Sequence, residues 1–523
     1  MNAKEGFGPK YASGDASRLD MARFRLRSFI ASLPESELDR RSAPTDLADV
    51  AAALEGNPRA VLFEQAGPEK APLAGNVCAS RSRLAAAFGT TSQNLTQEVM
   101  KRLAVRQDIV EVTRADAPAQ QVVLQGKDAD LTKLPIHLQH GLDGAPYISA
   151  SIDFAVDRDS GWVNSGVRRL MLRGRHEAGM DVNAPSDLRA IYEAAVKRGE
   201  RLPVAFVVGS HPIDHVAATM RVPVDEMQLL ANLRGTALPV VRCVSCDLMV
   251  PADAEWVIEG YMDERGYVES EGPYGEFLGY YGEVKQNPVF HCTAITHRRD
   301  AMFQTATISG ATMAHTDTAQ LNALRSEVTL WRALQTAVRE VTGVYAVPQS
   351  GGGFNARIGI RQRVPGEARN AIAAAFACLV NVKHVFVVDP DIDLFSDAQI
   401  EWALATRFQA DRDLVVQNGM RAMPLDPSLG SARTWSKAGF DLTLPFQRPG
   451  EPRPLGYRVP APPTYEGKRF ASIEAALADG PKYFQELMAA TGSRDGREIV
   501  LDLDAIRQKG RLDRDHEGRW LLK

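Results

Sequence analysis

Residues 269–281 read Glu-Ser-Glu-Gly-Pro-Tyr-Gly-Glu-Phe-Leu-Gly-Tyr-Tyr, and no other stretch of the chain is as informative. Glu269, Glu271 and Glu276 crowd into this stretch, and its proline and three glycines favour tight turns that bring the backbone close to a ligand. Crowded carboxylates repel one another, so we expect one of them to hold a proton near neutral pH and act in proton transfer. A solvated acidic turn is the alternative interpretation.

The segment that surrounds this stretch, residues 116–317, consists mainly of predicted strands. Runs rich in β-branched and aromatic residues, bounded by Gly, Pro or Asp, predict strands at residues 121–124, 147–156, 204–208, 240–250 and 288–296. Helical spacing predicts helices at 187–197 and 224–233. The fourth run contains Cys243-Val-Ser-Cys246, which we interpret as a buried strand carrying two thiols rather than as a metal or redox site.

The flanking segments mix helix and strand signals. Residues 1–115 predict an α/β domain with helices at 21–33 and 81–88 and a strand at 60–63. Residues 318–446 predict a second α/β domain, with an apolar stripe at 321–338, a helix at 367–379, and strands at 357–360 and 384–388. Residues 447–523 begin with a linker rich in Pro and Gly, and continue as two helices and two short strands in a winged-helix-like pattern.

Composition narrows the class of protein. The 523 residues carry a formal charge of −4, and 45% of them are hydrophobic, which excludes a disordered chain, a collagen and a disulfide scaffold. The near-neutral charge disfavours nucleic-acid binding, so we expect the tail to dock subunits rather than DNA. We expect a cytoplasmic protein, because no run is long enough to span a membrane, the N-terminus lacks a signal-peptide core, and the five cysteines are an odd number.

Two further stretches contain residues suited to binding anions. Asn164-Ser-Gly-Val-Arg168-Arg169 follows a predicted strand, and an arginine there can clamp a carboxylate or phosphate with two hydrogen bonds. Lys437, in Ser-Lys-Ala-Gly-Phe-Asp-Leu-Thr, can bind a phosphate as a point charge. Taken alone, each stretch is better explained as surface charge: a basic pair in the first, a solvated lysine in the second.

Together these stretches resemble the UbiD-type decarboxylases, which use prenylated FMN. The resemblance covers residues 131–445 and rests on the N-x-x-x-x-R spacing of Asn164 and Arg169, the phrase CVSCDLMVPADAEWVIEG at 243–260, the E-G-P-Y-G-E loop, and the SKxGxDxT phrase around Lys437. It implies a multidomain α+β protein. A mostly-β split barrel, residues 116–317, would bind the flavin between α/β domains at 1–115 and 318–446, with the tail at 447–523.

The resemblance also implies roles for individual residues. Arg169, Glu271 and Glu276 would form the catalytic network, with Glu276 as the proton donor. A divalent metal, manganese or magnesium, would be held by Asn164 and Glu226 and would bridge to the cofactor phosphate, with potassium nearby. Residues implied to contact the cofactor are Asn164, Ser165, Gly166, Val167, Arg168, Arg169, Ser186, Asp187, Glu226 and Lys437.

Two parts of the implied site remain open. Some relatives have a metal-binding His where this chain has Asp187, and this carboxylate can ligate the metal, cap the helix that starts there, or do both. His315 can hydrogen-bond a substrate, or cap the following helix with Thr316 and Asp317. Phe440 and Leu442 are implied as apolar walls of the substrate pocket.

The implied activity is reversible, non-oxidative decarboxylation of an aromatic, heteroaromatic or α,β-unsaturated acid, with the flavin as electron sink. A flavin prenyltransferase would supply the cofactor, and the enzyme would be a homo-oligomer, a dimer or a hexamer. A flavoprotein of the same fold with another role, or a DNA-binding regulator that uses the tail, are the alternatives. Strict alternation along a strand would separate Arg169 from Asn164, so we predict an irregular backbone at residues 165–167.

Overall fold

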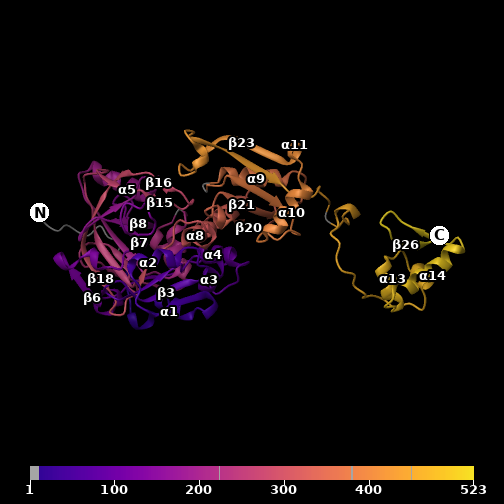
Figure 1. The fold of residues 1–523 in the computed structure, drawn as a ribbon, viewed down its shortest axis with the longest axis horizontal. Helices are drawn as coiled ribbons and strands as arrows, with labels where there is room; N and C mark the ends of the chain where they lie inside the picture. Colours follow the sequence, from indigo (N-terminus) through magenta and orange to yellow (C-terminus); the bar gives the residue numbers. More distant parts are fainter. Residues whose placement is uncertain (1–10, 223, 379–380, 449) are drawn as a thin grey trace. The chain divides into compact units, whose positions relative to one another are not determined.

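The computed structural model describes residues 11–222, 224–378, 381–448 and 450–523. The chain divides into two compact units, Met1–Thr443 and Leu444–Lys523 (Figure 1). None of the helices in the described part combines the length and apolar composition that a membrane crossing needs.

A closed six-stranded antiparallel barrel forms the centre of the first unit. The strands follow each other in the order β13-β10-β7-β8-β9-β18, and β13 pairs with β18 to close the ring, while β6 adds to β18. Closure leaves no unpaired edge within the ring. Phe206 and Phe290 meet edge to face inside the apolar cluster that fills the barrel, with ring centroids 4.9 Å apart. The bounds are β6 (Val122–Gln125), β7 (Tyr147–Val156), β8 (Val163–Leu172), β9 (Glu177–Met180), β10 (Leu202–Val208), β13 (Trp256–Met262) and β18 (Val289–His297).

Three helices and a hairpin lie between barrel strands β9 and β13 in the chain. The predicted helices at 187–197 and 224–233 are α5 (Asp187–Lys197) and α7 (Glu226–Arg234), and α6 (Pro212–Thr219) lies between them in the chain. The predicted strand at 240–250 is wrong as a single element. It is a hairpin of β11 (Leu238–Arg242) and β12 (Met249–Pro251), which pairs further with β5 (Ile109–Glu111) and β1 (Ala12–Ser13).

The N-terminal segment packs a four-stranded sheet with helices. The sheet order is β19-β4-β3-β2, which brings β19 from the end of the barrel domain into the N-terminal sheet. The helix predicted from residue 21 begins only at Leu26, because the Asp20 carboxylate accepts the N–H groups of Ala22 and Arg23 and forms a turn there instead. The bounds are α1 (Leu26–Ser32), β2 (Leu38–Arg41), α2 (Leu47–Leu54), β3 (Ala60–Ala66), β4 (Ala71–Gly75), α3 (Arg81–Ala87), α4 (Leu95–Leu103) and β19 (Phe303–Gln304).

One long helix, α8 (Asp317–Leu334), contacts the N-terminal segment, the barrel segment and the C-terminal sheet of this unit. At its start the Asp317 carboxylate accepts the backbone N–H of Thr307 at 2.8 Å and that of Cys78 at 2.5 Å. Further along, the fully buried Glu327 pairs with Arg81 at 2.8 Å. The contacts to Cys78 and Arg81 join residues more than 200 positions apart, and α8 also packs against α6 and α4.

The C-terminal part of the first unit is a five-stranded sheet in the order β20-β21-β22-β24-β23, covered on both faces. Helices α8 and α9 pack on one face, while α10 packs on the other with Val388 and Leu442. The helix predicted at 367–379 ends at Ala377, and Leu379 lies outside the described residues. The bounds are β20 (Val341–Ala346), β21 (Asn355–Ile360), α9 (Glu367–Ala377), β22 (His384–Val388), α10 (Asp397–Arg407), α11 (Ala410–Asp413), β23 (Leu414–Arg421) and β24 (Thr434–Asp441).

The second unit has its own small core. Leu487, Ile499, Leu503 and neighbouring apolar residues are buried between three helices and a hairpin, rather than the two helices predicted. Its elements are α12 (Ile473–Ala478), α13 (Phe484–Thr491), α14 (Gly496–Gln508), β25 (Leu512–Arg514) and β26 (Trp520–Leu522).

Candidate active site

Strand β8 carries two sets of polar side chains on its opposite faces. Pairing with β7 is regular from Val163 to Arg168, so alternation places Asn164 and Arg168 on one face and Arg169 on the other. The predicted irregularity at residues 165–167 is therefore wrong. The irregularity lies on β7 between Ile148 and Ser151, directly opposite Arg169. A regular strand suffices because the two sets serve different faces.

Arg169 is at the centre of a buried network of carboxylates. Its Nε and Nη2 donate to the two oxygens of Glu271 at 3.0 and 3.2 Å, its Nη1 donates to Glu276 Oε1 at 2.8 Å, and its Nη2 also donates to Asp181 at 2.9 Å. Burial opposes the charge on Arg169, but the charges of Glu276 and Glu271 outweigh burial and raise its pKa. The two glutamates are buried, so the stretch is not a solvated acidic turn.

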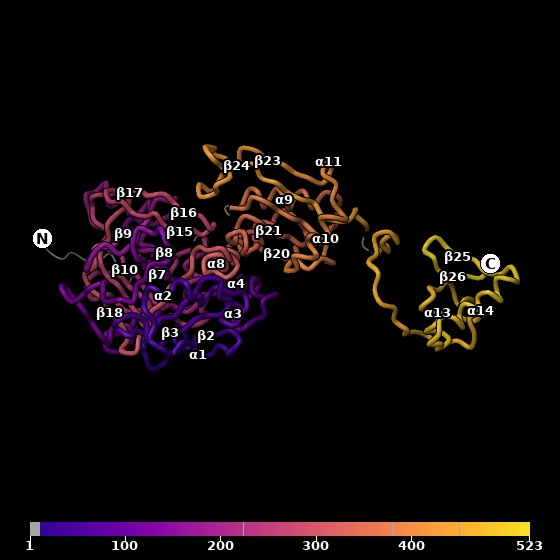
Figure 2. Tube along the Cα trace, viewed as in Figure 1, coloured from indigo at the N-terminus to yellow at the C-terminus, as the bar shows by residue number. Residues whose placement is uncertain are grey.

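The loop after β13 forms two nested strand pairs, and both glutamates lie on or next to their strands. Figure 2 shows the course of the backbone in this loop. β14 (Glu269–Glu271) pairs with β17 (Lys285–Asn287), and β15 (Tyr274–Gly275) pairs with β16 (Tyr281–Gly282). Gly272 has φ +97°, which favours glycine, and a Cβ on Gly275 would lie 2.5 Å from the His140 ring. These glycines explain how the chain turns so tightly between Glu271 and Glu276.

Three further residues complete the network, and we did not predict any of them. The Tyr274 ring lies under the guanidinium of Arg169, 4.4 Å from ring centroid to Cζ, which is a cation–π contact. Asp181 bonds Arg169, and Lys285 lies 3.4 Å from Asp181 and 3.9 Å from Glu276. Asp181 follows β9 and Lys285 begins β17, so strand pairing rather than local sequence brings them in.

The opposite face of β8 gathers a second polar cluster. Asn164 Nδ2 donates to Asp153 Oδ2 at 3.0 Å, and Arg168 Nε lies 3.1 Å from Asp153 Oδ1. The backbone N–H of Ser165 donates to the Glu226 carboxylate. Burial raises the pKa of Asp153 to about 6 and that of Glu226 to about 8, and the nearby charge of Asp187 adds to the effect on Glu226.

The predicted metal ligands are therefore close to one another. Because Asn164 donates through Nδ2, its Oδ1 is left to bind a cation. The carboxylates of Glu226 and Asp187 lie within electrostatic reach of each other, and these oxygen donors suit manganese or magnesium. Asp187 is not the helix cap: Ser186 caps α5 by accepting the N–H of Arg189 at 3.3 Å, so the Asp187 side chain has no capping role.

Several cations lie beside this cluster. Arg221 feels the charges of Glu226 and Asp187 as well as those of Arg168 and Arg421. Arg325, on α8, has a buried Nε with no hydrogen-bond partner among the described residues, and burial lowers its pKa to about 10. A buried cation that lacks an anion fits a phosphate group, which makes this region suitable for the phosphate of a flavin nucleotide.

The remaining predicted site residues are placed as follows. Lys437 is buried on β24, donates to the Phe376 carbonyl at 2.9 Å, and is not the solvated lysine that its stretch alone suggests. Thr316, rather than His315, caps α8 by accepting the Ala319 N–H at 3.2 Å. Phe440 and Leu442 pack in an apolar cluster made wholly of C-terminal residues. Gly166 and Val167 lie in the regular part of β8.

Family models match most of the chain. They describe the N-terminal, Rift-related and C-terminal domains of 3-octaprenyl-4-hydroxybenzoate carboxy-lyase, and they match residues 37–103, 110–312 and 319–442. The chain belongs to the UbiD family. It is therefore a UbiD-class carboxy-lyase, and the central barrel is the Rift-related domain.

Proteins similar to this UbiD protein in sequence or in structure are named as decarboxylases or as UbiD-class enzymes. It is 34% identical over 425 residues to anhydromevalonate phosphate decarboxylase of Methanosarcina mazei, covering 80% of this chain and 95% of the relative. The enzyme of that name from Aeropyrum pernix is 32% identical, with coverages of 80% and 93%. The UbiD-class enzyme HmfF from Pelotomaculum thermopropionicum, solved with FMN, superposes with a TM-score of 0.77 at 32% identity, covering 84% of this chain and 97% of HmfF.

Proposed function

We propose that this protein decarboxylates an α,β-unsaturated, aromatic or heteroaromatic acid, with Arg169 binding the departing carboxylate and Glu276 returning the proton. Prenylated FMN, the cofactor that the structure of an evolved dimeric form of HmfF contains, would supply the electron sink for the carbanion. A flavin prenyltransferase would provide it. Asn164, Glu226 and Asp187 would hold manganese or magnesium beside its phosphate, with Arg221, Arg325, Lys437 and potassium adding positive charge.

One observation carries this proposal. A guanidinium has five N–H donors, and four of those of Arg169 are bound to Glu271, Glu276 and Asp181 in the described structure. The remaining donor is on Nη1, the nitrogen that also contacts Glu276. A substrate carboxylate that takes this donor is therefore held next to Glu276.

The charge balance of the network would change when a substrate anion binds. Arg169 and Lys285 contribute two positive charges, against three negative charges from Glu271, Glu276 and Asp181. A substrate anion adds a further negative charge in a buried site, where like charges repel strongly. A proton taken up on Glu276 relieves this repulsion, and Glu276 can then deliver it to the carbon that has lost CO2.

Glu271 and Asp181 would act by positioning. Glu271 binds two nitrogens of Arg169 and accepts the Asn287 amide at 3.2 Å, which fixes the plane of the guanidinium. Tyr274 covers one face of that plane, so water is kept from it. Arg169 is then free to rotate very little, and the free Nη1 donor keeps one direction.

The experiment is to produce the protein together with a flavin prenyltransferase and to measure CO2 release from a panel of acids. Because the two relatives are named for a phosphorylated substrate, the panel should include a phosphorylated α,β-unsaturated acid beside furoic, benzoic and cinnamic acids. We expect a visible absorption band of bound flavin and turnover of at least one class. Flavin-loaded protein that releases no CO2 and exchanges no product hydrogen across the panel would contradict the proposal.

A further inference from the structure

The CxxC sequence at residues 243–246 lies at the tip of a hairpin, outside the site described above. Strands β11 and β12 pair up to Arg242 and Met249, and the backbone N–H of Cys243 donates to the Leu248 carbonyl at 2.9 Å. The residues between form a turn rather than the continuation of a strand. In a strand the two thiols would be three residues apart and would point to opposite faces, whereas the turn brings them together.

A buried carboxylate accepts hydrogen bonds from the residues of this turn. Glu259, on β13, is fully buried, and it accepts the N–H of Val244 at 3.0 Å and the N–H and hydroxyl of Ser245 at 2.7 and 2.8 Å. Ionised carboxylates accept up to about four hydrogen bonds, so these three donors leave capacity for one more partner. Among the ion pairs found in the described residues, none includes Glu259, and a buried carboxylate without a cation is costly.

We propose that Cys243, Cys246 and Glu259 bind a zinc ion. The two sulfur atoms and a carboxylate oxygen lie within 4.8 Å of one another, so small side-chain rotations would bring all three to the Zn–ligand distances of about 2.0–2.3 Å. Two thiolates with one carboxylate favour Zn²⁺ over Mg²⁺ or Mn²⁺, which prefer oxygen ligands only. On binding, the two thiols release two protons and form two Zn–S bonds, Glu259 forms a Zn–O bond, and water takes the fourth position.

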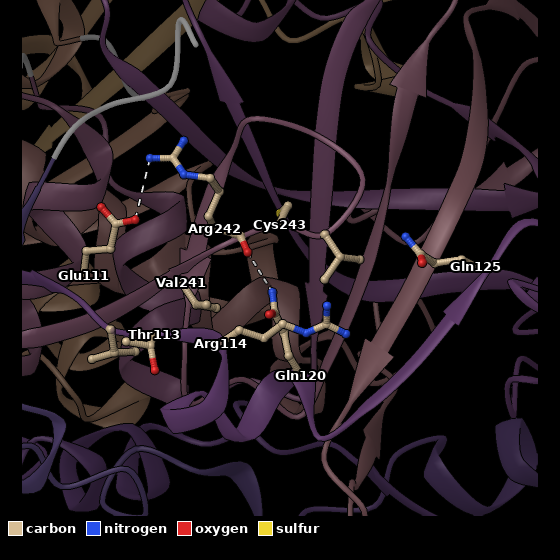
Figure 3. A pocket seen from close by; sticks show the side chains of 10 residues that line it. Glu111, Thr113, Arg114, Gln120, Gln125, Val241, Arg242 and Cys243 are labelled. Carbon is tan, nitrogen blue, oxygen red and sulfur yellow. Dashed lines mark hydrogen bonds and ion pairs between the residues drawn. The ribbon is translucent and has the colours of Figure 1, made fainter. Parts of the chain in front are cut away.

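One of the three proposed ligands, Cys243, borders a cavity. A cavity of about 390 Å³ is lined by Cys243, Val244 and Arg242 of the hairpin and by Gln120 and Glu111 of the neighbouring segments (Figure 3). Cys246 is itself partly exposed. The set differs from the Asn164, Glu226 and Asp187 cluster, which contains no sulfur. The role of the proposed zinc site would be structural, because the ion would link the β11–β12 hairpin to barrel strand β13.

The test is a cobalt titration of the full-length protein, purified without a metal-binding tag, reduced and stripped with a chelator. Cobalt bound by thiolates gives a near-ultraviolet charge-transfer band that oxygen-bound cobalt lacks, so we expect the band in the wild type and in Glu226→Ala. Cys246→Ser should remove the band and weaken Zn²⁺ binding by more than about 100-fold, exceeding the 10–100-fold cost of losing an outer-shell partner. Cys378→Ser, which changes the other partly exposed thiol, should keep both.

A second measurement on the wild type does not depend on how the variants fold. Zn²⁺ should protect Cys246, the partly exposed thiol of the set, from maleimide labelling, as located by mass spectrometry, whereas Mn²⁺ should leave it labelled. The proposal is overturned if cobalt gives no charge-transfer band, if Cys246→Ser binds Zn²⁺ as tightly as the wild type, or if Zn²⁺ leaves labelling unchanged. A Cys243–Cys246 disulfide that survives the reductant would likewise overturn it.

Discussion

Replacing Glu276 by Gln separates the acid function of this side chain from its structural role. Glutamine has the same shape, and its carbonyl oxygen can still accept the Arg169 Nη1 hydrogen bond, which is 2.8 Å long in the native protein. The hydrogen bond keeps its charged donor, Arg169, but loses its charged acceptor, so we expect a stability loss of about 1 kcal/mol, which is part of the roughly 1.5–3 kcal/mol that hydrogen bonds to charged groups contribute. The lost proton donor should cost far more, because general acid catalysis contributes roughly 10²–10⁴-fold, or about 3–5 kcal/mol of the barrier.

The assay is CO2 release per bound flavin, with deuterium incorporation into the product in D2O as a second readout. Glu269→Gln is the matched control, because Glu269 begins the same loop but is partly exposed and pairs with Arg173. We expect Glu276→Gln to lose at least about 100-fold in rate with flavin content unchanged, and Glu269→Gln to stay near the wild-type rate. Glu276→Gln turning over within about threefold of the wild type, or both variants falling equally, would refute the assignment.

Four further predictions test the rest of the site and the fold. Arg169→Ala should lose more than about 100-fold in turnover and keep its bound metal, whereas Arg168→Ala should mainly lower the amount of bound metal. Elemental analysis and steady-state kinetics on both variants distinguish these effects. The reverse pattern would show that the faces of β8 are misassigned. Glu226→Ala should lower metal and flavin together, and full flavin occupancy without metal would contradict a bridging ion. Arg234→Ala should cost about 3–5 kcal/mol in urea unfolding, because Asp214 and Asp253 stay buried without their cation; a loss below about 1 kcal/mol would contradict this. For Asp181, burial is outweighed by Arg169 and Lys285, so its pKa is lowered in the folded state. The stability that Asp181 adds is therefore present above its ordinary pKa of 3.8 and is lost as the pH falls through the lowered pKa. In Asp181→Asn, the free energy of unfolding should therefore fall less steeply as the pH is lowered. An unchanged dependence of the unfolding free energy on pH would exclude this contribution.

Local pattern predicts the regular elements of this chain well and its turns poorly. The apolar run at 147–156 coincides with β7, and the strand-to-helix alternation after residue 340 forms the predicted α/β sheet. The run at 240–250 failed because its apolar residues continue through a turn. The turn depends on Glu259, whose carboxylate reaches the backbone N–H groups from a strand that lies 14 or more residues away. A window of neighbouring residues contains no trace of that contact.

For the site residues, too, those marked by a local signal could be predicted and those brought in by long-range contacts could not. Glu271 and Glu276 could be found because a loop of Gly, Pro and acids is a local signal, and Arg169 because its spacing from Asn164 resembles that of the UbiD family. Asp181 and Lys285 could not, because they are 104 residues apart and meet only where β9 and β17 lie next to Arg169. Whether Asp187 caps α5 stayed open at the level of sequence for another reason: both Ser186 and Asp187 can accept a backbone N–H, and only the backbone geometry selects Ser186.

The two faces of β8 explain why the adjacent arginines are not equivalent. The face with Asn164 and Arg168 meets Asp153, and Gly166 lies between them because a Cβ there would lie 3.1 Å from the Asp153 carboxylate and 3.4 Å from the Arg168 guanidinium. The other face presents Arg169 to the glutamates, and the extra residue on β7 lies opposite it. One rigid strand thus fixes the distance between the predicted metal cluster and the carboxylate network, because the pleat allows neither to move without the other. A substitution at Gly166 should therefore disturb metal binding first and Arg169 only through the strand.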